Sequence, residues 1–309
     1  MPQTIDMSDA IDIELKGRFK LAIFLTAVTF IAEFIGGFIF NSLALLSDSA
    51  HVFMDVFALS LSWLALYICA MPPTETRTYG WHRSEVFAAF INGVTLLFVS
   101  LIIFYEAYQR LISPAEVKGL GTMIVASIGL AVNIIVASWL KGHRHEDLNI
   151  RSAYLHVVWD AVASVGVIIS GIIIYYTNWF IADPLISIGI GIIIIIGAVK
   201  IILESAHILL EGVPKEVDIK KIVEDIKAID GVQGIHTLHV WSICSNIHAM
   251  SAHIDIKKEA QSRRGEILDL INQKLAKDHH IFYTTLQAEC NGCITNQLFR
   301  AIEHKEHGH

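Results

Sequence analysis

The chain has 309 residues, of which 54% are hydrophobic and 17% are charged. A soluble domain of this length seldom needs so much apolar content, so the composition favours a membrane protein. The formal net charge of −7 gives no support for nucleic-acid binding, which usually needs a basic stripe. Charged residues are sparse up to about Pro214 and dense beyond it, which predicts a membrane part followed by a soluble part.

Six apolar stretches are long enough to cross a bilayer, which takes about 20 helical residues. They cover residues 19–40, 43–70, 84–110, 119–140, 152–177 and 181–203. Asp183 and Pro184 match an N-cap followed by proline at the first helical position, so we expect the last helix to begin there. Basic residues concentrate before the first stretch and in the second and fourth loops, which predicts that both termini face the cytoplasm.

The chain beyond the apolar stretches changes to alternating helix and strand patterns. A helix is predicted at 217–229, strands at 232–243 and 247–256, a second helix at 262–277 and a third strand at 281–289. We therefore predict an α-helical polytopic membrane protein with six transmembrane helices and a C-terminal cytoplasmic α/β ferredoxin-like domain. The expected divisions are an N-terminal segment 1–17, a membrane domain 18–212, the ferredoxin-like domain 213–293 and a disordered tail 294–309.

Two pairs of ionisable residues lie inside apolar stretches, where such residues are costly and usually functional. The second stretch contains His51 and Asp55, and the fifth contains His156 and Asp160, both with the spacing HxxxD. Residues four apart lie on one helix face, so each helix offers an imidazole beside a carboxylate. At about 1.5 Å per residue, both pairs reach mid-membrane in antiparallel helices. Together they would supply a tetrahedral set of two nitrogens and two oxygens, which suits Zn²⁺ better than Mg²⁺ or Ca²⁺.

Each of these residues also has a plainer interpretation. A single intramembrane histidine or aspartate can be an interhelical hydrogen-bonding residue, although two matching pairs at one depth are harder to explain in that way. Asp48 shares the helix face of His51 and Asp55, where it either supports the site or is a polar residue near the outer interface. Glu33 and Ser164 are more typical of interhelical polar contacts than of ligands.

The sequence resembles the cation diffusion facilitator family, in its zinc-transporting branch. The motifs that carry the resemblance are SLALLSDSAHVFMD, TYGWHRSEVFAAFING, LNIRSAYLHVVWDAVASVG, ADPLISI and GVQGIHTLHVWSI, within a span from about Arg18 to Cys293. The resemblance implies a homodimer with one transport site in each protomer, and a cytoplasmic domain that dimerises and binds further metal. The positions that match the family's transport site are His51, Asp55, His156 and Asp160.

The resemblance and the ligand set together imply a proton-coupled antiporter that exports Zn²⁺, with Cd²⁺ and Co²⁺ as alternatives, from the cytoplasm. The expected partners are a second copy of the chain, divalent metal ions, protons and the lipid bilayer, without nucleic acid. The expected location is the cell membrane, as a multi-pass protein of a bacterial inner membrane. The alternatives are a metal sensor or channel and an intramembrane metalloenzyme. We expect no enzyme, because HExxH is absent and four ligands leave no open coordination position.

Further candidate metal ligands lie outside the membrane stretches. His82 is a candidate because the family often places a metal near its loop, and a solvated loop histidine is an equal alternative. Cys290 and Cys293 form a CxxC, which either chelates zinc with ligands from elsewhere or remains a pair of thiols. The ligands that the resemblance favours for a regulatory Zn²⁺, with surface histidines as the alternative, are His236, His253 and Glu289.

Overall fold

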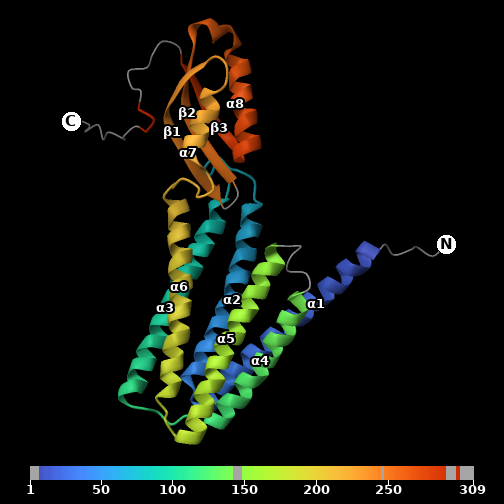
Figure 1. Ribbon diagram of the computed structural model, residues 1–309, viewed down its shortest axis with the longest axis vertical. Helices are drawn as coiled ribbons and strands as arrows, with labels where there is room; N and C mark the ends of the chain where they lie inside the picture. The colour runs from blue at the N-terminus through green and yellow to red at the C-terminus, as the bar shows by residue number, and fades with distance from the viewer. Residues whose placement is uncertain (1–6, 142–147, 245–246, 290–296, 300–309) are drawn as a thin grey trace, which may run out of the picture. The chain divides into compact units, whose positions relative to one another are not determined.

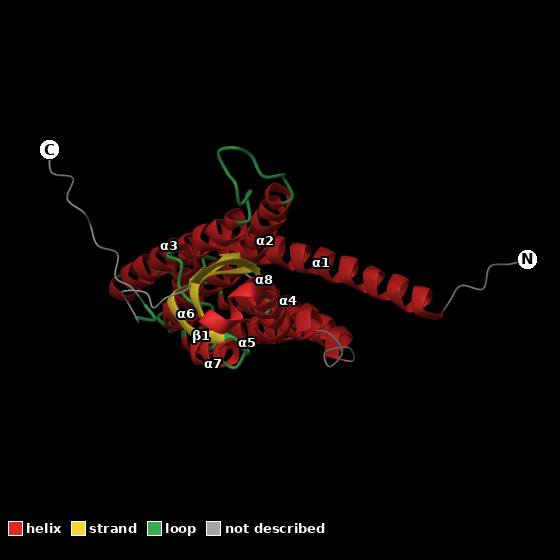
Figure 2. Ribbon diagram, turned by 90° about the horizontal axis from the view of Figure 1, so that it is seen from above, coloured by secondary structure: helices red, strands yellow, loops and turns green. Residues whose placement is uncertain are grey.

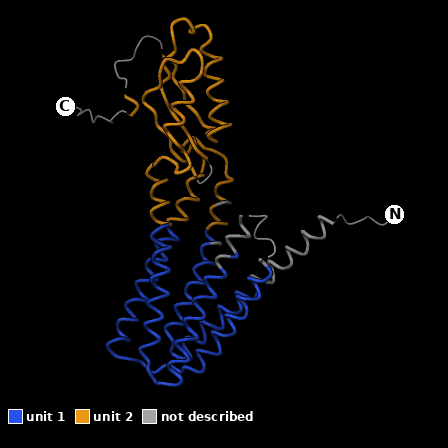
Figure 3. The backbone as a smooth tube through the Cα atoms, viewed as in Figure 1, with its two compact units in different colours: residues 1–61, 91–200 blue, residues 62–90, 201–309 orange. Residues whose placement is uncertain are grey.

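The computed structural model describes residues 7–141, 148–244, 247–289 and 297–299 (Figure 1). Within its helices, the side chains at 7–23, 59, 66, 140–141, 148–153 and 155–156 are not described. Cys290 and Cys293 therefore lie outside the described residues, as does the side chain of His156. The chain divides into two compact units, Met1–Leu61 with Ile91–Lys200 and Ser62–Phe90 with Ile201–His309 (Figure 3). The domain boundaries expected at residues 17, 212 and 293 remain predictions.

The described residues before position 210 form six long helices. These are α1 (Met7–Phe40), α2 (Leu43–Cys69), α3 (Arg83–Ile112), α4 (Gly119–Lys141), α5 (Leu148–Thr177) and α6 (Ala182–Leu209). The helices α2 to α6 are long and apolar enough to cross a membrane, whereas the described apolar part of α1, Phe24–Phe40, is shorter. Large apolar side chains such as Phe38 and Phe98 are exposed on these helices, as expected where a helix faces lipid. The predicted helical membrane region is confirmed.

Glycines let α4 approach its neighbours closely. A Cβ atom on Gly119 would meet the carbonyl oxygen of Gly171 at 2.7 Å, so the backbones of α4 and α5 are in contact there. A Cβ atom on Gly129 would collide with the carboxyl of Glu33, which therefore lies against the backbone of α4. Contacts between small residues are typical of helix packing in membranes. They show that α4 packs closely against both α1 and α5.

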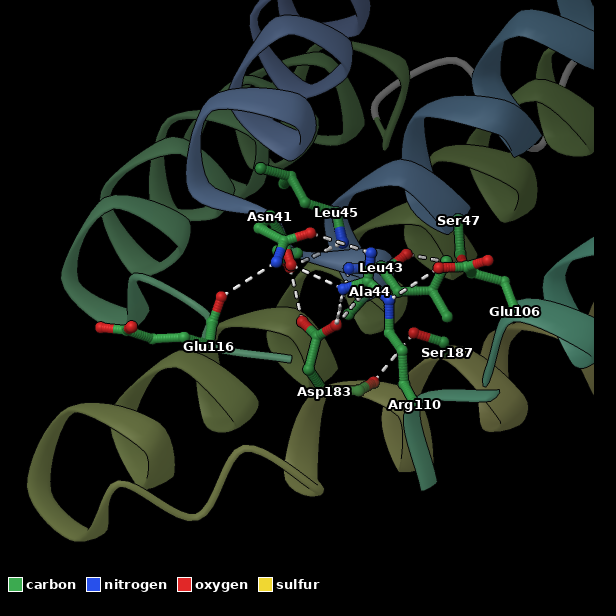
Figure 4. Close-up of polar contacts among 11 residues, drawn as sticks. Asn41, Leu43, Ala44, Leu45, Ser47, Glu106, Arg110, Glu116, Asp183 and Ser187 are labelled. Atoms are coloured by element: carbon green, nitrogen blue, oxygen red, sulfur yellow. Dashed lines mark hydrogen bonds and ion pairs between the residues drawn. The ribbon is translucent and has the colours of Figure 1, made fainter. Parts of the chain in front are cut away.

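The start of α2 differs from the sequence-based expectation about Asp183. The side chain of Asp183 was expected to cap its own helix, but it bonds to the first turn of α2 instead (Figure 4). Its Oδ2 accepts from the backbone N–H groups of Leu43 at 2.6 Å and Ala44 at 3.3 Å, and its Oδ1 accepts from the Ser42 hydroxyl at 2.5 Å. The Ser42 oxygen in turn accepts from the Leu45 N–H. The N–H groups that a helix start leaves unsatisfied are thus bonded by two side chains, one of them 140 residues away from Leu43.

The C-terminal domain is a three-stranded sheet with helices on one face. Its elements are α7 (Ile219–Lys227), β1 (Val232–Cys244), β2 (Ile247–Ile256), η1 (Lys258–Arg263), α8 (Arg264–His279) and β3 (Ile281–Glu289). The strand order is β1-β2-β3, with β1 and β2 antiparallel and β2 and β3 parallel. The parallel step needs a crossover connection, which η1 and α8 supply. Figure 2 shows the strands as one curved layer with α7 and α8 on its inner side. The predicted order of helices and strands is confirmed.

One apolar stripe on each of these helices faces the sheet. The stripe residues, none of them more than 1% exposed, are Ile222, Ile226, Ile267, Ile271 and Leu275. Their spacing of four is that of a helix with a single apolar face. This core holds the strands in a register that places His236 of β1 opposite His253 of β2. The register therefore decides which histidines of the domain meet.

A second histidine of β2 makes the stability of this domain depend on pH. Burial holds the pKa of His248 below its ordinary value, the negative charge of Glu216 acts to raise that pKa, and the nearby His280 acts to lower it. The Ser242 hydroxyl lies 3.2 Å from the His248 Nδ1. Because the pKa is lower in the folded than in the unfolded chain, the unfolded chain binds the proton more readily. The contribution of His248 to stability is therefore present above about pH 6.5 and is lost as the pH falls below that value.

We expect the protection factors of the β1 and β2 amides against hydrogen exchange to fall between about pH 7.5 and pH 5.5. The fall should be smaller in the variant His248→Gln, which has no group to protonate at this position. His239→Gln is the matched control, because His239 lies exposed on the neighbouring strand. The same fall in His248→Gln as in the wild type would show that another group sets the pH dependence.

Candidate metal sites

The first candidate site lies between α2 and α5. His51 and Asp55 are one turn apart on α2, and His51 Nε2 lies 4.0 Å from Asp55 Oδ2. The same nitrogen lies 3.6 Å from Oδ1 of Asp160 on α5. Asp160 is buried, while His51 and Asp55 are half-buried. One imidazole therefore approaches the carboxylates of both helices, at a place that an ion can reach.

Polar contacts between α2 and α5 follow an antiparallel register. The Ser164 hydroxyl donates to Asp48 Oδ2 at 3.3 Å, one turn away from the contact between His51 and Asp160. Moving forward along α2 from 48 to 51 therefore moves backward along α5 from 164 to 160. Position 156 is one further turn along α5 in the same direction, and its side chain lies outside the description. The structure thus gathers three of the four predicted ligands, His51, Asp55 and Asp160.

Two more carboxyls are buried beside this site. Asp48 is 2% exposed and bonded to Ser164, which favours a supporting position inside the bundle over one at the outer interface. Glu33 on α1 is 3% exposed and interacts electrostatically with Asp48 and Asp160. Carboxyls buried at membrane depth are expensive and mark functional regions. The sequence predicted an interhelical polar contact for Glu33 but not its neighbours, because these lie on other helices.

The second candidate site lies on the sheet of the C-terminal domain. Glu289 Oε1 lies 2.7 Å from His253 Nδ1, and its Oε2 lies 3.4 Å from His236 Nε2. One potential ligand atom from each of the three residues lies within 4.8 Å of the others. Asp255, which the sequence did not single out, adds an oxygen 3.6 Å from His236 Nε2. The result is two imidazoles and two carboxylates, the same kinds of donor as the four predicted in the membrane.

Strand geometry explains this grouping. His236 lies opposite His253, and a β-bulge at Thr237, which has a φ of 50°, places His239 opposite Ser251. The residues of β2 that alternate with these two belong to the apolar core, so both histidines lie on the face of the sheet away from the core, where His236 is 2% exposed and His239 is exposed. The β2–β3 pairing places Asp255 opposite Glu289, so both carboxylates reach the same side of the sheet. The buried Nε2 of His236 and Oδ1 of Asp255 have no hydrogen-bond partner among the described residues. Buried polar atoms of this kind need an explanation, and a bound cation is one that suits this donor set.

His82 belongs to neither group. It lines a cavity of about 1010 Å³, together with Arg77, Trp241 and Phe299. The Arg77 guanidinium stacks on the Trp81 ring at 3.8 Å, which orders the loop that carries His82. Within the described parts of the chain, His82 joins no group of three potential metal ligands.

Comparison with known proteins identifies the family. Residues 19–210 match the cation efflux transmembrane domain, and residues 214–290 match the cytoplasmic domain of cation efflux proteins. The chain is 40% identical over 263 residues to the cadmium, cobalt and zinc/H(+)-K(+) antiporter of Bacillus velezensis, a match that covers 84% of this chain and 83% of that protein. It is 37% identical over 274 residues to the metal cation efflux system protein CzcD of Cupriavidus metallidurans, covering 89% and 86%. It is 34% identical over 300 residues to the zinc transporter ZitB of Yersinia pseudotuberculosis, covering 94% and 95%.

The family resemblance inferred from the sequence motifs is thereby confirmed. The two matched domains together account for nearly all of the described chain, and each relative is matched over more than four fifths of its own length. The chain belongs to the cation efflux family, the cation diffusion facilitators, and carries both the transmembrane and the cytoplasmic domain of that family.

Proposed function

We propose that this protein exports divalent metal ions, with Zn²⁺ as the main substrate and Cd²⁺ or Co²⁺ as alternatives, from the cytoplasm in exchange for protons. The observation that carries the proposal is the approach of the His51 imidazole to Asp55 and Asp160. Membership of the cation efflux family supports metal efflux, and the relatives' names include zinc, cadmium, cobalt and H⁺. The ligands that we assign to the transport site are His51, Asp55, His156 and Asp160. The fourth, His156, is assigned from its spacing to Asp160 alone.

Proton coupling follows from the chemistry of these ligands. A metal ion binds neutral imidazole and ionised carboxylate, so protons and metal compete for the same groups. Histidine titrates near neutral pH and suits such an exchange. Cytoplasmic metal displaces protons when the site faces inward, and protons displace the metal when it faces outward. Competition at one site is then sufficient for antiport, without a separate proton path.

We assign a regulatory role to the second site. His236, His253 and Glu289, joined by Asp255, would hold a metal ion, which would coordinate the two buried atoms of His236 and Asp255 that lack a hydrogen bond among the described residues. The match to the family's cytoplasmic domain supports a homodimer. A metal ion that tightens this dimer would shift the inward–outward equilibrium by its different affinity for the two states. His82 and the pair Cys290 and Cys293 remain weaker candidates for metal binding.

We propose that this chain is a multi-pass protein of the cell membrane, namely a bacterial inner membrane, and that both of its termini lie in the cytoplasm. The basic loops support this orientation, which places the turn between α1 and α2 on the outer side. The transporter names among the relatives favour a carrier over an intramembrane metalloenzyme. A channel would need weak serial sites, whereas this donor set suits one tight tetrahedral site.

The test is metal flux into proteoliposomes that contain the purified full-length protein, with a pH gradient imposed across the membrane. We expect saturable Zn²⁺ flux that is driven by a proton gradient directed opposite to the flux. The direction of the flux should reverse when the proton gradient is reversed. Protein-free liposomes give the leak rate. Flux that never saturates and ignores the gradient would indicate a channel, and the absence of divalent-metal flux under every gradient would contradict the proposal altogether.

A further inference from the structure

A polar cluster joins the helix ends at the turn between α1 and α2, and two of its members, Ser42 and Asp183, are fully buried (Figure 4). Its members are Asn41, Ser42, Arg110 and Asp183, named here the Asp183 cluster. Asp183 is fully buried and accepts three hydrogen bonds from the start of α2. Arg110 Nη1 lies 3.9 Å from Asp183 Oδ2 and offers the opposite charge. A buried carboxylate with this many partners is held in one place, because losing them would leave the charge uncompensated.

Arg110 connects the cluster to α3 and to the turn before α2. Its Nη1 donates to the Asn41 carbonyl at 2.6 Å and its Nη2 to Asn41 Oδ1 at 3.0 Å, while its Nε donates to Glu106 at 3.1 Å. Asn41 has a φ of 55°, a left-handed conformation that asparagine tolerates better than most residues. Its side-chain amide donates to the carbonyl of Glu116, just before α4. The turn before α2 is thus held from both α3 and α4.

Asp183 is also fixed with respect to α5. A short turn at 178–181 links α5 to α6, and within it Asn178 N–H donates to Ile174 and Asp183 N–H donates to Phe180. Ile174 and Ala182 are buried together at this turn, with Phe180 packed against them. The carboxylate that caps α2 is therefore anchored to the hairpin that carries Asp160.

This connection matters because α2 and α5 both carry ligands of the proposed site. The eight residue steps from Leu43 to His51 span about 12 Å of helix, so a shift at the start of α2 is carried to the ligands. A slip by one residue would move them by about 1.5 Å. Metal sites tolerate deviations in ligand distance of about 0.2 Å. The first turn of α2 is almost completely buried, so its position is defined by packing as well as by the cap.

We propose that Asp183 is a positioning residue for metal transport. By capping α2 from the α5–α6 hairpin, it sets the axial register of His51 and Asp55 against Asp160. This inference rests on the proposed function. A residue that only stabilised the fold would change the amount of folded protein, whereas a positioning residue changes the metal affinity of the protein that does fold.

The test compares KM and Vmax for Zn²⁺ in proteoliposomes between the wild type and Asp183→Asn, with rates normalised to folded dimer. The substitution keeps the size of the side chain but replaces one acceptor oxygen with a donor, and it leaves Arg110 with Glu106 but without the Asp183 charge. We expect KM to rise by about tenfold with Vmax within about twofold of the wild type. Ser187→Ala is the matched control, because Ser187 is buried one turn further along α6 and its hydroxyl donates to the backbone carbonyl of Asp183, not to the carboxylate. Its KM should stay at the wild-type value.

A milder variant covers the case in which Asp183→Asn does not fold. Ser42→Ala keeps the carboxylate and its charge, removes one of its three donors, and should raise KM by about threefold. If the wild type transports metal and the folded variants have the wild-type KM, this inference is wrong while the proposed function stands. A wild type that moves no divalent metal would overturn the proposed function, and this inference with it.

Discussion

Replacing Asp160 with asparagine should reduce metal transport by at least about 100-fold while the protein still folds. Asparagine keeps the shape of the side chain but removes the negative charge that faces His51 Nε2 at 3.6 Å. The site then loses one of its two carboxylate ligands and the charge that compensates the metal ion. The measurement is Zn²⁺ flux in proteoliposomes under an imposed pH gradient, with size-exclusion chromatography to establish that the dimer is intact.

The matched control for this variant is Ser100→Ala on α3. Ser100 is fully buried, and its hydroxyl donates at 2.9 Å to the Leu96 carbonyl of its own helix, so the substitution removes a hydrogen bond within one helix. Its flux should remain at the wild-type rate. If Asp160→Asn folds and transports at that rate too, the transport site lies elsewhere, although family membership is unaffected.

The sequence predicted those parts of the fold that depend on a single segment of the chain. The strands at 247–256 and 281–289 match β2 and β3 to the residue, because turn residues bound their alternating patterns. The apolar stretches located the membrane helices but not all of their ends. The helix α6 runs to Leu209 instead of 203, since a helix can continue into residues such as Glu204 that have left the apolar layer.

The sites followed from the sequence only within single elements. The HxxxD spacing predicts that His51 and Asp55 share a helix face. Strand alternation predicts opposite faces for His236 and His239, which is wrong, because a β-bulge between them puts both on one face. Neither pattern says which faces meet. The burial of Glu33 beside α4, the addition of Asp255 to the second site and the cap that Asp183 places on α2 all depend on contacts between distant segments. The dipeptide Asp-Pro favoured a local cap, and tertiary packing redirected the carboxylate to another helix.

Replacing Glu289 with glutamine should remove the regulatory metal ion and leave the transport site in place. Glu289 is the residue that contacts both histidines, with one oxygen 2.7 Å from His253 Nδ1 and the other 3.4 Å from His236 Nε2. Glutamine cannot offer two oxygens or a negative charge, so we expect metal affinity at this site to fall by about 10- to 100-fold. Equilibrium Zn²⁺ binding to the purified full-length protein should then lose one class of site. Glu266→Gln is the matched control, because the carboxylate of this residue on α8 pairs with Arg263 away from the site.

The same variant separates a regulatory ion from an accidental one. Metal that binds only the folded domain stabilises it by about 2.7 kcal/mol at 100 times the Kd, so Zn²⁺ should raise the protection of the β1 and β2 amides in the wild type but much less in Glu289→Gln. If the ion regulates transport, metal on the cytoplasmic side should raise the Zn²⁺ transport rate of the wild type. Glu289→Gln should still transport Zn²⁺ but should not show this increase in rate. Equal stabilisation of both proteins by Zn²⁺ would place the metal elsewhere. Glu289→Gln could instead lose this class of Zn²⁺ site while its transport kinetics stay at the wild-type values. The ion would then be structural and would not regulate transport, because an ion shifts the inward–outward equilibrium only if its affinity differs between the two states.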